Sequence, residues 1–199
     1  MQLLYSPTSP YARKCRVAAR ERGLIPGIEE VDCNPHEDPA ELQAKNPLGR
    51  VPTLVLDDGR AVFDSPVICD LLESLGSAPP LVPGVGEGRF QVLVAAALAQ
   101  GMTDSAVNMV MESRRPEGER SSAAVARWRA SILRGLDSMM DHLSVQPGPL
   151  TLAHIACGSV LGYLDLRHGD MAWRDGRSAL ADWFEAFNAR PSMRETDPN

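Results

Sequence analysis

The sequence predicts a small α/β domain followed by an all-helical domain. Residues 1–76 alternate short apolar strands with helix signals in the order β-α-β-α-β-β-α. A stretch rich in proline and glycine follows at 77–88, and beyond it the strand signals fade. With 199 residues, the chain is long enough for two small domains. We therefore expect a first domain at 1–76, a linker at 77–88 and a helical domain at 89–199.

The first strand and the first helix are expected to be joined by a short turn. The apolar strand is predicted at Gln2–Tyr5. Ser9 suits an N-cap, and Pro10 suits the first helical position, because the N–H that proline lacks has no helical partner there. The helix should end at Arg22, since Gly23 suits the position that follows a helix C-terminus.

The rest of the first domain follows from turn residues and apolar spacing. Asp57-Asp58-Gly59 lies between two apolar runs, which is a strong hairpin signal. Ser65 is expected to cap a helix whose first residue is Pro66. The predicted elements are a strand at 27–33, a short helix near 40–45, strands at 53–56 and 61–63, and a helix that ends at Gly76.

The second domain is predicted to contain four helices. Each carries apolar residues at helical spacing, and the third is so apolar that it should be the buried central helix. The predicted helices are 89–112, 119–143, 151–166 and 178–189.

Composition and charge narrow the functional classes. The chain is 44% hydrophobic and carries a formal net charge of −6, which argues against nucleic acid as the main partner, because phosphate binding needs a basic surface. The longest apolar run, 92–99, is too short to span a membrane. We expect neither a nucleic-acid partner nor a membrane partner.

Four widely spaced cysteines form no C-x-x-C motif, and the histidines show no metal-ligand spacing. This pattern indicates reduced, buried thiols in a cytoplasmic protein, without a metal site or a disulfide framework. No secretory signal is expected at the N-terminus.

The start of the first predicted helix is a candidate anion site. A strand-to-helix turn directs unpaired N–H groups and the positive end of the helix dipole toward whatever lies over Ser9. An anion such as a thiolate would be stabilised there. The alternative is that Ser9 is a helix cap only.

Four motifs, taken together and in this order, resemble the glutathione S-transferase family over essentially the whole chain. They are S-P-Y-A at 9–12 followed by R-K-C-R, N-P-L-G-R-V-P-T-L at 46–54, Asp64-Ser65, and T-L-A-H-I-A at 151–156. The opening looks most like serine-type bacterial members near the theta, zeta and beta groups. The resemblance implies a thioredoxin-like N-terminal domain and a C-terminal helical bundle.

The resemblance also implies where glutathione and its thiol would bind. Ser9 is expected to activate the thiol, with Tyr5 and Thr8 as alternatives. Val51 and Pro52 would be joined by a cis peptide bond, and the Val51 backbone would pair with the cysteinyl part of glutathione.

Charged and polar residues would hold the ends of glutathione. Ser65 is expected to bind the γ-glutamyl carboxylate and Asp64 the ammonium group, although most members of the family have glutamate in place of Asp64. Asp104 resembles a position that reaches the same ammonium across a dimer interface. Lys45 and Arg50 are candidates for the glycyl carboxylate, with solvated surface charges as the alternative.

The implied reaction is the attack of a glutathione thiolate on a small electrophile, with glutathione as co-substrate and no other cofactor. The electrophile is expected to contact Met102 and Tyr163, whose alternative role is packing in the core. A homodimer is expected. The alternative functions are a non-catalytic interaction or regulatory protein of the same fold, and a glutathione-dependent reductase or peroxidase.

One residue departs from the family pattern at the start of the buried helix. The family places an aspartate three residues after the capping Ser or Thr, whereas here Thr151 is followed by His154. Neutral histidine can accept the N-cap hydrogen bond, but imidazolium cannot. We therefore expect the second domain to lose stability when His154 is protonated.

Overall fold

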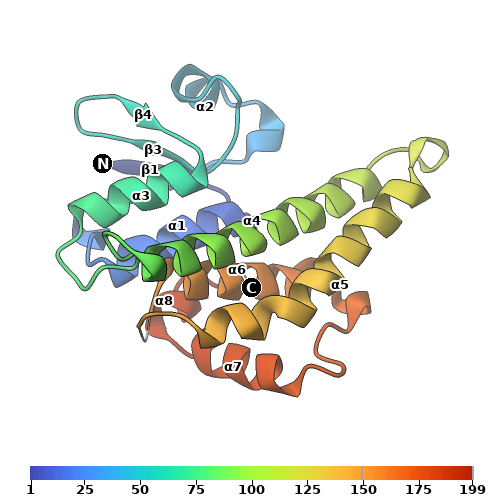
Figure 1. The fold of residues 1–199 in the computed structure, drawn as a ribbon. Coiled ribbons are helices and arrows are strands. Elements are labelled where there is room, and N and C mark those ends of the chain that lie inside the picture. The colour runs from blue at the N-terminus through green and yellow to red at the C-terminus, as the bar shows by residue number, and fades with distance from the viewer. Residues whose placement is uncertain (149, 199) are drawn as a thin grey trace. The chain divides into compact units, whose positions relative to one another are not determined.

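The computed structural model describes residues 1–148 and 150–198. The chain forms two compact units. Unit one comprises residues 1–81 and 189–199, and unit two comprises residues 82–188. The predicted fold class, a mixed α/β domain followed by a helical domain, is confirmed (Figure 1).

Unit one is built on a four-stranded mixed sheet in the order β2-β1-β3-β4. The strands are β1 (Gln2–Tyr5), β2 (Glu29–Asp32), β3 (Thr53–Val55) and β4 (Ala61–Val62). β1 is parallel to β2 and antiparallel to β3, and Leu4 lies opposite Thr53. The last residue of β1 and the first residue of β3 therefore lie side by side, at one end of the strands.

Helices cover both faces of this sheet (Figure 1). They are α1 (Pro10–Glu21), α2 (Ala40–Lys45) and α3 (Ser65–Leu75), with 3-10 turns at Ile25–Gly27 and Pro35–Glu37. A further short helix, α8 (Pro191–Arg194), packs against α1. Leu4 and Val55 form a buried cluster with Leu42 of α2. Because neighbouring strand residues face opposite ways, Leu3 and Leu54 point to the other face, which α1 and α3 cover.

The local signals in the sequence locate most elements of unit one to within two residues. The prediction for Ser65 is wrong in one respect, because Asp64 is the N-cap of α3 and Ser65 is its first residue. Gly23 follows α1 with φ of 71°, which is the left-handed conformation that the prediction required.

Arg22, directly after α1, ties that helix to the end of α3. Its guanidinium donates to the backbone carbonyls of Glu73, Gly76 and Ala78 and lies 3.4 Å from the Glu73 carboxylate. A Cβ atom added to Gly76 would come within 2.9 Å of the Arg22 carbonyl oxygen. Only glycine lets the two chain segments approach this closely.

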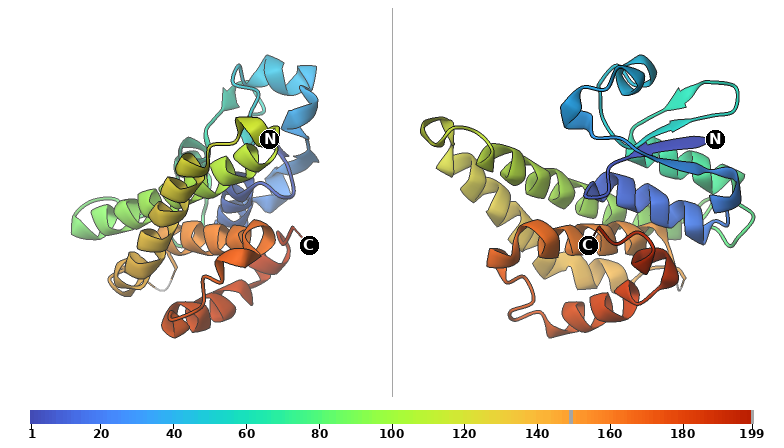
Figure 2. Two further views of the ribbon diagram at one scale, coloured as in Figure 1. Left: turned by 90° about the vertical axis from the view of Figure 1, so that its right-hand side faces the viewer. Right: turned by 180° about the vertical axis from the view of Figure 1, so that it is seen from behind.

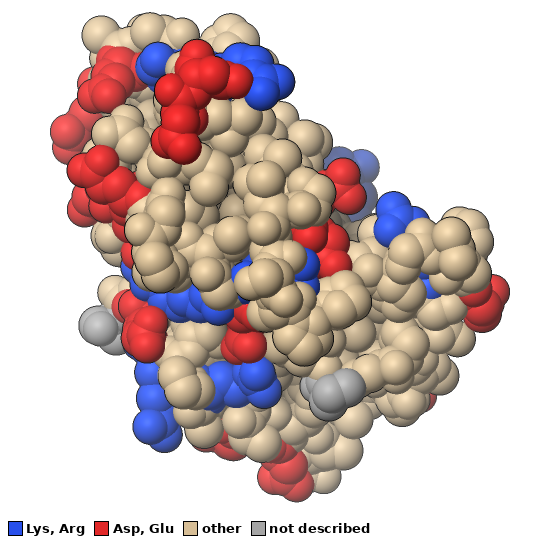
Figure 3. Space-filling model, turned by 90° about the vertical axis from the view of Figure 1, so that its left-hand side faces the viewer, with Lys and Arg blue, Asp and Glu red and all other residues tan. Residues whose placement is uncertain are grey.

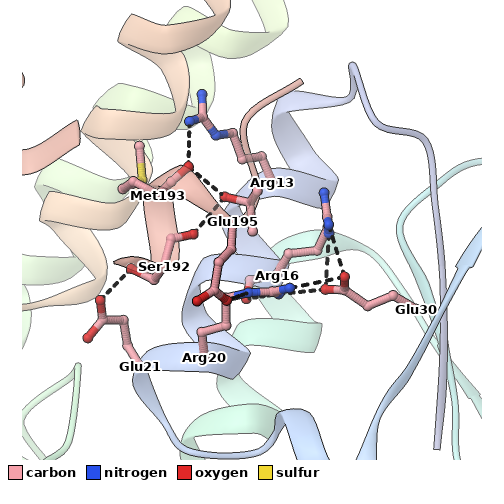
Figure 4. Close-up of polar contacts among 9 residues, drawn as sticks. Arg13, Arg16, Arg20, Glu21, Glu30, Ser192, Met193 and Glu195 are labelled. Carbon is pink, nitrogen blue, oxygen red and sulfur yellow. Dashed lines mark hydrogen bonds and ion pairs between the residues drawn. The ribbon is translucent and has the colours of Figure 1, made fainter. Parts of the chain in front are cut away.

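Two arginine side chains of α1 form ion pairs with one carboxylate of the edge strand β2 (Figure 4). Arg16 and Arg20 each donate two hydrogen bonds to the carboxylate of Glu30, at 2.6–3.2 Å. Burial by itself would raise the pKa of Glu30, but the hydrogen bonds from the two guanidinium groups outweigh it and lower that pKa to about 2. The charged form of Glu30 is therefore held firmly against α1.

The C-terminal segment 189–198 packs against the other side of the same helix. Arg13 donates to the Met193 carbonyl at 3.0 Å, and Arg190 forms a bidentate pair with Glu21 at 3.0 Å. The helical domain expected at 89–199 included this segment, and no helix was predicted at the position of α8. The difference arises because these contacts join residues about 170 or more positions apart, which local patterns do not report.

Unit two is a helical bundle. Its helices are α4 (Glu87–Ser113), α5 (Ser122–Ser144), α6 (Leu152–Arg167) and α7 (Ser178–Asn188), with 3-10 turns at Glu117–Glu119 and Gly169–Met171. α4 and α5 run side by side as an antiparallel hairpin (Figure 2). The prediction that the third helix is buried is confirmed, since eleven of the sixteen residues of α6 are buried.

A capping box starts α6, with histidine in the position of the usual acid. The Thr151 backbone N–H donates to Nδ1 of His154 at 3.0 Å, and the Thr151 hydroxyl lies 2.9 Å from the same nitrogen. The His154 ring also stacks near Trp183 and Phe187, with ring centroids 6.1 and 6.4 Å away. Since Nδ1 accepts the backbone hydrogen bond, the ring must be unprotonated at that atom.

Within the described residues, no helix is long and apolar enough to cross a membrane. On the face that Figure 3 shows, much of the surface is uncharged, and acidic and basic side chains form small separate groups on it.

We expect Glu30→Gln to lower the free energy of unfolding by about 1–2 kcal/mol at neutral pH, because a partly solvated pair contributes less than its full pKa shift. A carboxyl group with a lowered pKa stabilises the fold above its unfolded pKa and loses this effect as the pH falls through the folded value. The difference between wild type and variant should therefore shrink between pH 4.5 and about 2. Urea unfolding across this range measures it. The control is Glu29→Gln, which changes an exposed neighbour of Glu30. If Glu29→Gln lowers the free energy of unfolding by the same amount, the ion pairs of Glu30 do not stabilise the fold specifically.

We expect the thermal midpoint of the wild type to fall between neutral pH and about pH 5.5, because protonated His154 cannot accept the N-cap hydrogen bond. His154→Asp restores an acceptor that stays ionised over this range. Calorimetry of the two proteins at both pH values measures the effect. If His154→Asp leaves the midpoint near pH 5.5 unchanged, the capping role of His154 in pH sensitivity is excluded.

Candidate functional site

Ser9 lies at the junction of β1 and α1, and its backbone is extended, as an N-cap requires. Its N–H donates to the Ser6 carbonyl at 3.0 Å and closes the turn. Its hydroxyl oxygen accepts from the Ala12 N–H at 3.2 Å. Because the oxygen is the acceptor in this bond, the hydroxyl proton is still available to donate to an anion over the helix N-terminus.

Tyr5 and Thr8, the two alternatives to Ser9, occupy different environments. The guanidinium of Arg16 lies over the Tyr5 ring, 4.2 Å from its centroid, and Arg16 is itself held by Glu30. The Tyr5 ring is thus part of the packing between α1 and β2. Thr8 is exposed in the turn. Which of the three hydroxyl groups would act on a thiol stays a prediction.

The loop before β3 contains the Val51–Pro52 bond, which is cis, as the family resemblance implied. A second cis bond joins Phe63 to Asp64. The Val51–Pro52 loop precedes β3, and the turn that carries Ser9 follows β1. Because β1 and β3 are antiparallel neighbours, the loop and the turn lie at the same end of the strands.

Asn46 supports this loop and was not singled out from the sequence. Its side chain is 1% exposed and donates to the Arg50 carbonyl and to the Thr53 hydroxyl, both at 3.0 Å. The Thr53 hydroxyl donates to the same carbonyl at 2.8 Å. Asn46 opens the N-P-L-G-R-V-P-T-L motif, so the signal was present, but the contacts that give it meaning depend on the folded loop.

The start of α3 supplies a second helix N-terminus in unit one. Asp64 is exposed, and within the described residues its carboxylate makes no capping hydrogen bond to the helix. Ser65 is 1% exposed, and its carbonyl oxygen lies 3.5 Å from Sγ of Cys15 in α1. The Cys15 contact thus joins the middle of α1 to the first residue of α3.

Lys45 and Arg50 flank the loop before β3. Lys45 is the last residue of α2 and is half-buried, whereas the Arg50 side chain is exposed. Their contact with a ligand carboxylate stays a prediction.

The remaining predicted residues belong to unit two. Asp104 is exposed on α4 and accepts from the Gln100 amide at 3.2 Å. Met102 is 2% exposed and packs against Gly135 of α5. Tyr163 lies edge-on to His168, and burial raises the pKa of its phenol. Met102 and Tyr163 therefore have packing roles, and their contact with an electrophile stays a prediction.

Comparisons with known proteins agree with the motifs. Family models of the glutathione S-transferase N-terminal domain and C-terminal domain match residues 3–80 and 122–186. The GST-like protein YibF of Escherichia coli K12 is 33% identical over all of this chain and 98% of its own length.

Solved structures are similar over the whole chain. A glutathione transferase family member from Pseudomonas fluorescens Pf-5, crystallised with bound glutathione, is 34% identical with a TM-score of 0.93, covering 100% of this chain and 98% of its own. A glutathione S-transferase from Methylobacillus flagellatus KT, with GSH bound, is 37% identical with a TM-score of 0.91, covering 100% and 99%.

We expect Ser9→Ala to lower the free energy of unfolding by about 1 kcal/mol, which is the usual cost of losing an N-cap. Ser121 offers a matched control, because its hydroxyl accepts from the Ala124 N–H of α5 at the same distance of 3.2 Å. Chemical unfolding of Ser9→Ala and Ser121→Ala should therefore give losses of similar size. If Ser9→Ala has no effect on stability, the hydroxyl of Ser9 does not cap α1 in solution.

Proposed function

Because this chain belongs to the glutathione S-transferase family, we propose that it binds glutathione in unit one and activates the thiol for attack on a small electrophile, with Ser9 as the activating residue. The observation that carries this proposal is the Ser9 hydroxyl, whose oxygen caps α1 while its proton is available to a thiolate.

The physical task is to stabilise a thiolate at neutral pH. A free thiol has a pKa of about 8.5, so most of it is protonated. One hydroxyl hydrogen bond and the positive end of α1 both favour the anion, and together they would lower its pKa by roughly two units, since each unit corresponds to about 1.4 kcal/mol. The thiolate then forms the new bond to the electrophilic carbon.

The other end of the proposed site recognises glutathione as a peptide. The Val51 backbone lies at the same end of the strands as the Ser9 turn. It would pair with the cysteinyl residue of glutathione through backbone hydrogen bonds, as neighbouring strands do. Ser65 and Asp64, at the start of α3, would hold the γ-glutamyl carboxylate and ammonium groups. Lys45 and Arg50 would attract the glycyl carboxylate. Asp104 would act on the same ammonium from a second copy of the chain.

We also infer a homodimer formed through α4. Phe90, Leu93 and Val94 are 62%, 38% and 54% exposed and lie at i, i+3 and i+4, so they share one face of the helix. Exposed apolar side chains grouped in this way are typical of association surfaces.

The free thiols suit a reducing compartment, and we therefore place the protein in the cytoplasm.

Calorimetric titration of glutathione into wild type and Ser65→Ala tests the binding site. We expect wild type to bind in the micromolar to millimolar range, and Ser65→Ala to bind about tenfold more weakly, because it loses a hydrogen bond to a charged group. Ser121→Ala is the control and should bind like wild type. A folded wild type that does not bind glutathione would favour the interaction-protein alternative.

Transferase assays with a panel of small electrophiles then test Ser9. We expect Ser9→Ala to bind glutathione within about threefold of wild type, but to lose about 100-fold in kcat/KM at neutral pH, as for the loss of one donor to a developing anion. Its activity should recover as the pH rises, because the thiol then ionises unaided. If Tyr5→Phe shows this behaviour and Ser9→Ala does not, Tyr5 is the activating residue.

We expect the double variant Phe90→Glu/Val94→Glu to be monomeric, because charges on the α4 face oppose its burial against a second copy. Sedimentation velocity of the variant and the wild type measures the change. Val145→Glu removes an apolar side chain that is 50% exposed elsewhere in unit two, and is the control. A wild type that sediments as a monomer would rule out the dimer.

A further inference from the structure

Two cysteine sulfurs lie against each other between α1 and α3. The Sγ atoms of Cys15 and Cys69 are 3.8 Å apart, within reach of a weak thiol–thiol hydrogen bond and too far apart for a disulfide. Their side chains are 0% and 4% exposed, and both thiols are free. The proposed transferase mechanism uses neither of them.

The surroundings of the two sulfurs make them unequal. Burial, followed by the interaction with Cys69, raises the pKa of Cys15. The hydrogen bond from Cys15 and then the positive charge of Lys14 lower the pKa of Cys69, although burial opposes them. Cys69 is therefore the thiol that ionises first, with the Cys15 S–H as its donor.

We propose that Cys15 and Cys69 form a redox-modification site at which hydrogen peroxide converts the two thiols to an intramolecular disulfide. The oxidant must be close to water in size, because both sulfurs are buried. A reactive cysteine with a second sulfur in contact is the arrangement in which a sulfenic acid is captured as a disulfide.

The step balances in atoms and electrons. The Cys69 thiolate attacks one oxygen of hydrogen peroxide, so that an S–O bond forms, the O–O bond breaks and hydroxide leaves. The Cys15 sulfur then attacks the Cys69 sulfenic acid, so that the S–S bond forms and the S–O bond breaks. The departing hydroxyl takes the Cys15 proton and leaves as water. The hydroxide released in the first step takes up the proton that Cys69 lost on ionising. The two thiols thus supply two electrons, and the peroxide is reduced to two molecules of water.

The other two cysteines provide a contrast. Burial raises the pKa of Cys157 to about 12, and Cys157 is the only cysteine in unit two. Cys33 is half-buried, and burial together with Glu41, Asp32 and Glu37 raises its pKa. Neither has the combination of a lowered pKa and an adjacent sulfur that Cys69 has.

Disulfide formation would change the N-terminal ends of both helices. The sulfurs must approach by about 1.8 Å to reach the length of an S–S bond, about 2.05 Å. Cys15 would also lose its one S–H, which can donate either to Cys69 or to the Ser65 carbonyl, 3.5 Å away. α1 begins beside Ser9 and α3 begins at Ser65, so oxidation should weaken glutathione binding. This consequence, unlike the disulfide itself, rests on the proposed function.

The variant Cys33→Ser/Cys157→Ser keeps only Cys15 and Cys69, so any disulfide that forms within one chain must join these two residues. The reduced, folded variant is treated with hydrogen peroxide, the remaining thiols are alkylated, and intact mass and unreduced peptide maps are recorded. We expect the loss of two hydrogen atoms per chain, a peptide that links Cys15 to Cys69, and reversal by dithiothreitol. Adding Cys15→Ser to this background should change the product to an oxygen adduct on Cys69.

Two results would overturn the redox site. One is oxygen addition in the two-cysteine variant without the linked peptide. The other is a pair of thiols that stay reduced in the folded protein under conditions that oxidise Cys33 in wild type.

Glutathione titration of the reduced and oxidised two-cysteine variant tests the consequence separately. Weakening one hydrogen bond to glutathione is enough for a several-fold loss, so we expect the affinity to fall at least about fivefold on oxidation. An unchanged affinity would refute the coupling. Failure of the reduced protein to bind glutathione would refute the proposed function, while the peptide map would still decide whether the disulfide forms.

Discussion

The position of helix α1 is the constraint on which the rest of unit one depends. Its apolar side is buried from Ala12 to Ala19, and its arginines are fixed on two sides. Arg16 and Arg20 form ion pairs with Glu30 of the edge strand, and Arg13 donates a hydrogen bond to the carbonyl of Met193 in the C-terminal segment. Because α1 is anchored along its length, its N-terminus and Ser9 are held in a defined place. A helix free to slide could not aim a hydroxyl proton and a dipole at one sulfur atom.

The same helix connects the proposed chemistry to the buried sulfurs. α1 carries Ser9 at its start and Cys15 within it, while α3 carries Ser65 at its start and Cys69 within it. A movement that brings the two sulfurs together would shift α1 and α3, whose first turns are proposed to hold glutathione. Binding and oxidation would therefore use one pair of packed helices, and tight packing would transmit the movement because an interior has little room to absorb it.

Unit two shows how a single substitution changes the physics of a local motif. The capping box of α6 satisfies the Thr151 N–H with an imidazole nitrogen in place of a carboxylate. A carboxylate keeps its acceptor lone pairs across the physiological range, whereas an imidazole gives up its acceptor when it is protonated. The geometry of the cap is retained, and what changes is its dependence on pH.

The sequence by itself determined the elements, because caps, turns and apolar periodicity act over a few residues. Gly23 after α1, the Asp57-Asp58-Gly59 hairpin and the burial of α6 were all predictable in this way. Only the tertiary structure decided the docking of residues 189–198 on α1, the Asn46 network beneath the Val51–Pro52 loop and the contact between Cys15 and Cys69. The Cys15–Cys69 contact and the docking of 189–198 join residues far apart in the chain, and the Asn46 bonds depend on the path of the loop. No local pattern specifies such contacts, since they exist only once the helices have packed.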